Sequence, residues 1–153
     1  MPDGRVSGFF HGGVTVSDLD RSLAFYRDAL GLAIQVERLA TDDYLRQIHG
    51  LPFTAVRMAF LAVPGSPTMV ELLQYRGLPS TPARTRPSDP GTGHLCLYVD
   101  DLDALDARLR AAGYHARSPA LVTVTAGPNI GSRVVYFEDP DGYPVELLER
   151  PRR

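Results

Sequence analysis

Four side chains of types that bind metal ions recur at two matched pairs of positions. His11 opens the segment HGGVTV and Glu71 lies in MVELL, while His94 opens HLCLYV and Glu146 lies in PVELL. Two imidazoles and two carboxylates suit one divalent transition metal ion per site, such as Ni²⁺, Zn²⁺, Co²⁺, Mn²⁺ or Fe²⁺. Four protein ligands in an octahedron leave two positions open. The sequence therefore predicts a small-molecule substrate with adjacent oxygens that could chelate there.

This ligand set has a definite reaction chemistry. A divalent ion acts as a Lewis acid and can stabilise an enolate formed next to a carbonyl. Either Glu71 or Glu146 could remove the proton as a base, and the other could return it. The pattern predicts a divalent-metal-dependent lyase or isomerase that abstracts a proton next to a carbonyl through a metal-bound enolate. A single histidine or glutamate on a strand is more often structural, but that explanation would have to hold at all four matched positions.

An internal repeat explains how these side chains could meet. Residues 11–29 and 94–112 are identical at eight of 19 aligned positions, and the segment VELL recurs at 70–73 and 145–148. We interpret the chain as a single domain of 1–153. It consists of a module at 9–75, a linker at 76–93 rich in proline and glycine, and a module at 94–150. Packing of the modules about a local two-fold axis would gather the four side chains there.

The elements follow the same order in each module. Alternating hydrophobicity and turn residues predict strands, and apolar spacing predicts one amphipathic helix per module. The pattern is βαβββ, so the fold class is α+β with two tandem modules. The expected strands are 9–16, 33–39, 55–62, 68–75, 93–99, 120–125, 132–139 and 143–149, and the expected helices are 22–30 and 101–113. Residues 42–50 form an insertion in the first module, where we expect a short helix or loop.

Composition limits the classes of binding partner and the cellular location that we expect. The chain has 153 residues and a formal charge of −2, which favours neither nucleic acid nor a membrane surface as partner. The chain has no apolar segment typical of a signal peptide or of a membrane span, so we expect a cytoplasmic protein. Its only cysteine, Cys96, lies in an apolar run and is interpreted as a buried, inert thiol. A homodimer is the default expectation for assembly.

Three sequence segments support a family resemblance. The segments HGGVTVSDLDRSLAFYRDALGL, GHLCLYVDDLDAL and FEDPDGYPVELLE resemble the vicinal oxygen chelate superfamily, and the resemblance extends over residues 9–150. The nearest branch contains glyoxalase I and methylmalonyl-CoA epimerase. The resemblance implies paired βαβββ modules that form curved mixed sheets around a central metal site. It also implies that His11, Glu71, His94 and Glu146 bind the metal.

The chain also departs from this branch. Bacterial glyoxalase I usually has an arginine four residues after its first histidine and an asparagine four residues after its first glutamate. This chain has Thr15 and Tyr75 at those positions, and it has no lysine. The resemblance therefore implies a substrate other than a glutathione hemithioacetal. The epimerase usually has glutamine where this chain has Glu71, which favours the glyoxalase pattern of ligands.

Two other functions remain open at this point. His11, His94 and Glu146 alone would form the two-histidine, one-carboxylate set of an extradiol dioxygenase. Relatives that lack the metal ligands include bleomycin resistance proteins, which bind an antibiotic without metal. We also consider three residues as possible lining of the substrate pocket. Tyr98 and Cys96 share the strand face of His94, and His49 lies in the insertion, where it is either a gating residue or a solvated one.

Overall fold

The computed structural model describes residues 4–83 and 86–151. Residues 84 and 85 of the predicted linker lie outside the described residues. The chain divides into two compact units, one made of Met1–Asp20 and Gly31–Pro79 and the other of Arg21–Leu30 and Ser80–Arg153. Each unit contains one four-stranded sheet. Within the described parts of the chain, no helix has the length and apolar character needed to cross a membrane.

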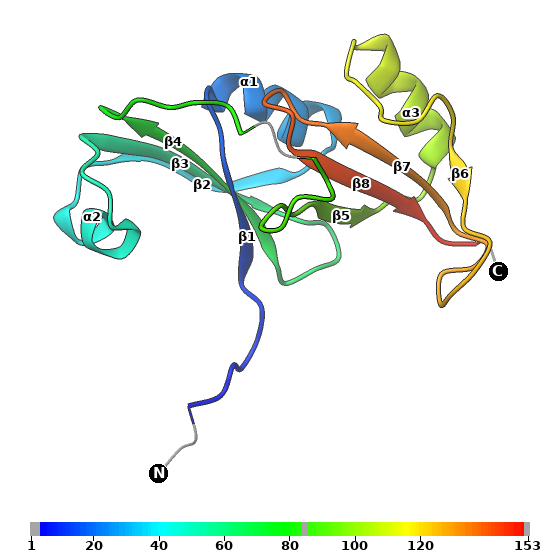
Figure 1. Ribbon diagram of the computed structural model, residues 1–153, viewed down its shortest axis with the longest axis horizontal. Coiled ribbons are helices and arrows are strands. Elements are labelled where there is room, and N and C mark those ends of the chain that lie inside the picture. Colours follow the sequence, from blue (N-terminus) through cyan, green and yellow to red (C-terminus); the bar gives the residue numbers. More distant parts are fainter. Residues whose placement is uncertain (1–3, 84–85, 152–153) are drawn as a thin grey trace. The chain divides into compact units, whose positions relative to one another are not determined.

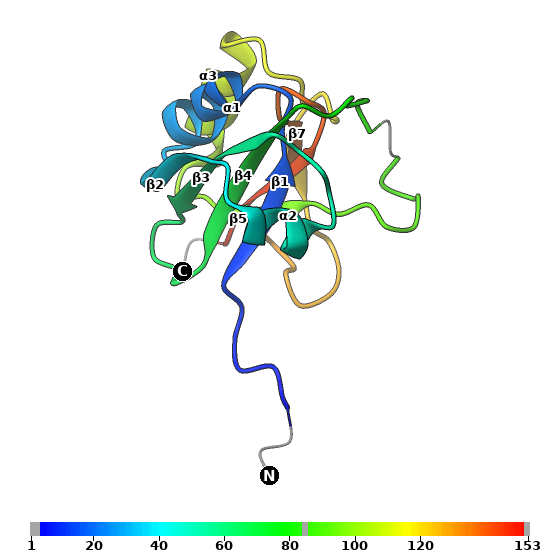
Figure 2. The ribbon, with the colours of Figure 1, turned by 90° about the vertical axis from the view of Figure 1, so that its left-hand side faces the viewer.

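The sheet of the first unit is mixed. Its strands are β1 (His11–Thr15), β2 (Ala33–Ala40), β3 (Ala55–Ala62) and β4 (Met69–Arg76), in the order β1-β4-β3-β2 (Figure 1). β1 is parallel to β4, and β3 is antiparallel to both β2 and β4. In the view of Figure 2, the segment before β1 extends beyond the sheet. One face carries the fully buried side chains Leu61, Val70 and Leu72, because Val70 and Leu72 are two residues apart on β4 and Leu61 is the β3 neighbour of Val70.

The predicted insertion forms helix α2 (Asp43–His49), which ends at Gly50 in the left-handed conformation with φ of 64°. Leu45 of α2 packs in a cluster with Phe53, Met58 and Leu73. Leu73 lies two residues from Glu71 along β4, so both side chains are on the same face of the sheet. The insertion therefore provides the hydrophobic cover for the face that carries Glu71.

The second unit repeats the arrangement. Its strands are β5 (Leu95–Tyr98), β6 (Val122–Thr123), β7 (Arg133–Glu138) and β8 (Pro144–Glu149), in the order β5-β8-β7-β6, with β5 parallel to β8. Helix α3 (Leu102–Ala111) begins at Asp101, whose carboxylate accepts a hydrogen bond from the backbone N–H of Ala104. α3 packs against β7 and β8. The predicted α+β class and the βαβββ order of both modules are confirmed.

The first predicted helix differs from its expected form. It consists of α1 (Leu19–Leu23) and η1 (Ala24–Ala29), and η1 is a π-helix whose wider turn accompanies two adjacent buried side chains, Phe25 and Tyr26. Residues 21–30, which the sequence pattern assigns to the first module, belong to the second compact unit. There the ring of Phe25 meets that of Tyr114 edge-on, at 4.8 Å between centroids.

A buried carboxylate organises the β7–β8 turn. Asp139 is 4% exposed, and its Oδ1 accepts hydrogen bonds from the backbone N–H groups of Asp141 and Tyr143, each at 2.8 Å. Its Oδ2 accepts a hydrogen bond from the phenol of Tyr26 at 3.0 Å. Burial raises the pKa of Asp139, although these hydrogen bonds act in the opposite direction. The turn fixes the register of the hairpin that carries Glu146.

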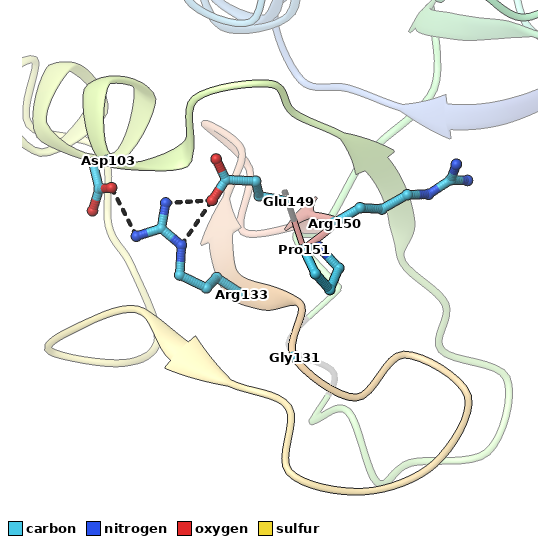
Figure 3. Close-up of a pocket in the computed structure, with 6 residues that line it drawn as sticks. All are labelled: Asp103, Gly131, Arg133, Glu149, Arg150 and Pro151. Atoms are coloured by element: carbon cyan, nitrogen blue, oxygen red, sulfur yellow. Dashed lines mark hydrogen bonds and ion pairs between the residues drawn. The ribbon is translucent and has the colours of Figure 1, made fainter. Parts of the chain in front are cut away.

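An arginine between two carboxylates occurs at matched positions in the two units. Arg57 of β3 forms an ion pair with Asp20 at 2.7 Å and a second one with Glu37. Arg133 of β7 contacts Asp103 at 2.7 Å and also pairs with Glu149 of β8, as Figure 3 shows. Arg133, Asp103 and Glu149 line a hollow of about 350 Å³. Because the carboxylates of Asp103 and Glu149 are already paired with Arg133, we assign this hollow no chemical role.

Candidate functional site

The first predicted pair of ligands meets across two parallel strands. Gly13 of β1 is aligned with Glu71 of β4, and His11 lies two residues before Gly13 on the same face. The imidazole Nε2 of His11 is 3.1 Å from Oε2 of Glu71. A Cβ atom at Gly13 would lie 3.5 Å from that same carboxylate oxygen. Glycine therefore leaves open space beside the carboxylate of Glu71.

Aromatic rings surround the first pair. Phe60 is the antiparallel neighbour of Glu71, and its ring centroid is 5.4 Å from that of His11. Phe10 is the second ring beside the imidazole, at 4.9 Å between centroids, and its own ring centroid is 6.1 Å from that of Phe60. The Nδ1 atom of His11 is buried and has no hydrogen-bond partner among the described residues. Ring packing therefore orients His11.

The second predicted pair has the same spacing. His94 directly precedes β5, and its Nε2 atom is 3.0 Å from Oε2 of Glu146 on β8. The strand neighbours of Glu146 are Cys96 on β5 and Tyr136 on β7. The phenol of Tyr136 donates a hydrogen bond to Oε2 of Glu146 at 2.8 Å and lies 3.3 Å from Nε2 of His94. The second pair therefore has a hydrogen-bonding hydroxyl group at the sheet position where the first pair has the ring of Phe60.

The groups beside Glu146 remain protonated at neutral pH. Burial, followed by the hydrogen bond to Glu146 and the charge of that carboxylate, raises the pKa of Tyr136 to about 12. Burial of the thiol, with the charge of Glu146 and a hydrogen bond to it, raises the pKa of Cys96 to about 11. Both groups thus act as donors toward Glu146. The raised pKa also means that Cys96 is not a ready thiolate nucleophile.

The prediction that Cys96 is buried is wrong. The residue is exposed, because it lies on the face of β5 that also carries His94, and the second module lacks the insertion that covers this face in the first. Its thiol nevertheless lies against Glu146, which is why its pKa responds to that carboxylate. Alternation along the strand predicted that Cys96 shares the face of His94. The prediction of burial was wrong because it relied on the hydrophobicity of the surrounding run.

The spacing within each pair fits metal binding. Two ligands at right angles on one ion, each at a bond length of about 2.1 Å, are about 3.0 Å apart. The two nitrogen-to-oxygen distances are 3.1 and 3.0 Å. In residues 4–83 and 86–151, no group of three or more His, Cys, Asp and Glu side chains is arranged to hold a metal ion. Each unit thus presents one histidine–glutamate pair, which we call the first half-site (His11 and Glu71) and the second half-site (His94 and Glu146).

A cavity of about 460 Å³ adjoins the second half-site. His94 and Tyr136 form part of its wall. Its other walls are mainly apolar, with one cation, and include Pro87, Val122, Val134, Pro144 and Arg117. Arg117 is paired with Glu138 at 3.3 Å, so its charge is largely compensated. The cavity therefore suits a compact organic molecule of low charge.

The other proposed lining residues have different surroundings. The imidazole of His49 contacts the phenol of Tyr75 and lies beside the ring of Phe53, at 5.9 Å between centroids. His49 therefore contributes to the packing of α2 in the first unit. Tyr98 is 66% exposed, and the guanidinium of Arg150 lies 3.8 Å above its ring.

Sequence reasoning missed the role of Tyr136 beside Glu146. The signal was present in the turn DPDGY, because Tyr136 and Glu146 are equally far from its centre at Asp141. Counting outward through an antiparallel hairpin pairs these two residues, and the observed register agrees.

Comparisons with known proteins identify the family and the fold of the chain. A family model described as the glyoxalase/bleomycin resistance protein/dioxygenase superfamily matches residues 8–147. A 2-epi-5-epi-valiolone epimerase from Actinomyces sp is 34% identical over 144 residues, which cover 92% of this chain and 78% of the relative. A lactoylglutathione lyase from Haemophilus influenzae is 34% identical over 143 residues, covering 91% and 90%. A glyoxalase family protein from Bacillus cereus has a similar fold, with a TM-score of 0.85 at 19% identity over 99% of both chains.

Proposed function

Because this chain belongs to the glyoxalase/bleomycin resistance protein/dioxygenase superfamily, we propose that it is a divalent-metal-dependent isomerase or lyase. It removes a proton from a carbon next to a carbonyl. The observation that carries the proposal is the occurrence of two histidine–glutamate pairs at matched strand positions with nearly equal spacing, 3.1 and 3.0 Å. The relatives named as an epimerase and a lyase support the same type of reaction.

We assign the ligands of one Ni²⁺, Zn²⁺, Co²⁺, Mn²⁺ or Fe²⁺ ion to His11, Glu71, His94 and Glu146. Two carboxylates neutralise the charge of the ion, and two imidazoles suit this group of metals. When bound, the ion supplies Lewis-acid polarisation of the substrate carbonyl. Mixing subunits that carry Glu71→Gln with subunits that carry Glu146→Gln tells whether the ligands come from one chain or from two in a homodimer. Recovery of metal binding in the mixture indicates two chains.

The protein's own groups perform the proton transfer. A carboxylate oxygen of Glu71 or Glu146 forms an O–H bond with the substrate proton. The electron pair of the broken C–H bond becomes the double bond of the enolate, and the carbonyl pair moves to oxygen. Return of the proton to the opposite side of the same carbon inverts that carbon. Where the deprotonated carbon carries a hydroxyl, return of the proton to the former carbonyl carbon, with transfer of the hydroxyl proton to the enolate oxygen, moves the carbonyl instead.

We propose an α-hydroxy ketone as substrate class in preference to a glutathione hemithioacetal. The side chain of Thr15 on β1 and that of Tyr75 on β4 replace the arginine and asparagine expected for glutathione. The phenol of Tyr75 is engaged by His49. The low-charge cavity beside the second half-site supports a compact substrate. The relative from Actinomyces sp is named for 2-epi-5-epi-valiolone, which is therefore the first compound to test.

Metal content tests the proposal directly. The purified chain is stripped with a chelator, incubated with each of the five metals and analysed for bound ion. We expect one ion per set of four ligands, and weaker binding by Glu71→Gln and Glu146→Gln. Glu138→Gln is the matched control, because Glu138 also pairs with a histidine, His115 at 3.2 Å, outside both half-sites. A wild-type chain that binds none of the five metals overturns the proposal.

The reaction is tested by exchange of hydrogen for deuterium. The metal-loaded enzyme is incubated in D₂O with 2-epi-5-epi-valiolone and, separately, with methylglyoxal and glutathione. We expect deuterium at the carbon next to the carbonyl of the hydroxy ketone and little turnover of the hemithioacetal. Faster turnover of the hemithioacetal would refute the substrate class. Consumption of O₂ with Fe²⁺ and a catechol would instead support a dioxygenase.

A further inference from the structure

We propose that Arg117 is a specificity-determining residue, which donates hydrogen bonds to a neutral oxygen of the substrate in the cavity beside the second half-site. This role rests on the proposed function and narrows its substrate class to a hydroxy ketone that carries further hydroxyl groups. All of the residues involved belong to the second unit.

Arg117 lies beside strand β7. Its backbone N–H donates to the carbonyl oxygen of Tyr136 at 2.9 Å, and the preceding Ala116 forms a β-bridge with Phe137. Because side chains alternate between the two faces of a sheet, the fully buried Phe137 is on one face, and Arg117 and Tyr136 share the other. Arg117 and Tyr136 both line the cavity of about 460 Å³, as does His94 of the second half-site. A ligand that fills the cavity can therefore contact the guanidinium and the imidazole together.

The guanidinium of Arg117 has unused hydrogen-bond donors. Its side chain is 24% exposed, and its Nε atom is buried without a hydrogen-bond partner among the described residues. The ion pair with Glu138, at 3.3 Å from Nε, is not aligned for a hydrogen bond. A guanidinium has five N–H donors, and a donor removed from water without an acceptor costs free energy. An oxygen of a ligand in the cavity would supply the acceptor.

The surroundings of Arg117 favour a neutral oxygen over an anion. The carboxylate of Glu138 compensates the charge of the guanidinium. Thr92 and Ser118 also line the cavity, and their hydroxyl groups donate to backbone carbonyl oxygens at 2.9 and 2.8 Å, so these hydroxyl oxygens are left to accept. A ligand hydroxyl can accept from Arg117 and donate to such oxygens, whereas a carboxylate or a phosphate dianion can only accept. The wall therefore suits a ligand with several hydroxyl groups.

Ligand binding to the full chain, stripped of metal, tests this role without turnover. Affinities are measured by NMR titration for 2-epi-5-epi-valiolone, a cyclic hydroxy ketone with further hydroxyl groups, and for 2-hydroxycyclohexanone, which lacks them. Arg117→Gln should bind the valiolone about tenfold more weakly than the wild type does, and its affinity for 2-hydroxycyclohexanone should stay within about twofold. Arg38→Gln is the matched control, because Arg38 also pairs with one carboxylate, that of Asp42, but lies on β2 of the first unit. Its affinities for both compounds should equal those of the wild type.

The wild-type chain gives a second readout that needs no variant to fold. The Nε–H signal of Arg117, assigned through its own backbone, should shift as the valiolone is added. The same signal should stay in place when 2-hydroxycyclohexanone is added, because that compound has no further hydroxyl group to reach the guanidinium. A Tm equal to that of the wild type shows that Arg117→Gln is folded.

Three results overturn the role of Arg117. They are a wild-type chain that does not bind the valiolone, an unshifted Arg117 signal, and an unchanged affinity of Arg117→Gln for the valiolone. Tighter binding of dihydroxyacetone phosphate than of dihydroxyacetone, lost in Arg117→Gln, would instead show an anion site and overturn the assignment of a neutral oxygen. Each of these results leaves metal binding and deuterium exchange intact. A chain that binds no metal overturns the proposed function itself, so the two failures are distinguishable.

Discussion

The first unit surrounds its half-site with rings and a glycine, whereas the second surrounds the same ligand types with hydrogen-bond donors. In the first, Phe60 packs on His11. In the second, Tyr136 bonds Glu146. The repeat thus preserves the histidine, the glutamate and their spacing but not the residues that restrain them. The same pair of residue types therefore has different surroundings in the two units.

The units also differ in what covers the sheet face that carries the glutamate. In the first unit α2 packs onto this face through Leu45, whereas in the second a cavity of about 460 Å³ adjoins His94. The insertion therefore fills space in one module that remains open in the other. Three pairs of substitutions test the packing of α2 in the first unit and the matched turns and ion pairs of the two units.

The largest effect is expected where α2 packs on the first sheet. Leu45→Ala removes a side chain that is 8% exposed and should lower the free energy of unfolding by about 3 kcal/mol. Ile48→Ala, on the same helix but 71% exposed, should change it by less than about 0.5 kcal/mol. Urea denaturation of both variants measures the difference. Equal values would mean that α2 does not provide a hydrophobic cover.

A smaller effect is expected at the hairpin turns. Asp139→Ala leaves the phenol of Tyr26 and two backbone N–H groups without their acceptor, which should cost about 2 kcal/mol. The matched turn between β3 and β4 contains Ser66, whose hydroxyl accepts a hydrogen bond from the backbone N–H of Thr68 at 3.1 Å. Ser66→Ala should cost about 1 kcal/mol. If thermal unfolding ranks Ser66→Ala as the more damaging variant, the buried carboxylate is not the main restraint on its turn.

The smallest effect is expected where the units are alike. Asp20 and Asp103 occupy matched places at the start of their helices, and both are exposed partners of an arginine. Asp20→Asn and Asp103→Asn should each cost about 0.5 kcal/mol, since the arginine keeps its second carboxylate in both cases. Calorimetry at low and high salt should give matched losses that diminish with salt. Clearly unequal losses would show that the repeat does not extend to these ion pairs.

Local pattern was sufficient for the order of elements. Alternation along strands and the recurrence of VELL identified His11, Glu71, His94 and Glu146 as matched positions, whereas the contacts of His11 with Glu71 and of His94 with Glu146 come from the register of each sheet. The metal site and its use of all four ligands stay predictions. The helix at 22–30 was found, but not its π-helical turn, because burial of Phe25 and Tyr26 depends on contacts with residues such as Tyr114 that lie far away in sequence. No local pattern contains such contacts.

Exposure of Cys96 was missed for a related reason. An apolar run such as HLCLYV indicates a buried strand only when both faces of the sheet are covered. In the second unit one face packs on α3, whereas the other, which carries Cys96, has no counterpart of α2. Burial therefore depended on an insertion present in only one module.

The position of residues 21–30 in the second unit has a consequence for the order of folding. The phenol of Tyr26 and the carboxylate of Asp139 are 113 positions apart in the chain. During synthesis from the N-terminus, the segment with Phe25 and Tyr26 leaves the ribosome long before the hairpin that buries it. The first sheet can form early, whereas the core of the second unit can form only after nearly the whole chain has been synthesised. Chain termination at the linker would therefore leave two large aromatic side chains without their packing partners.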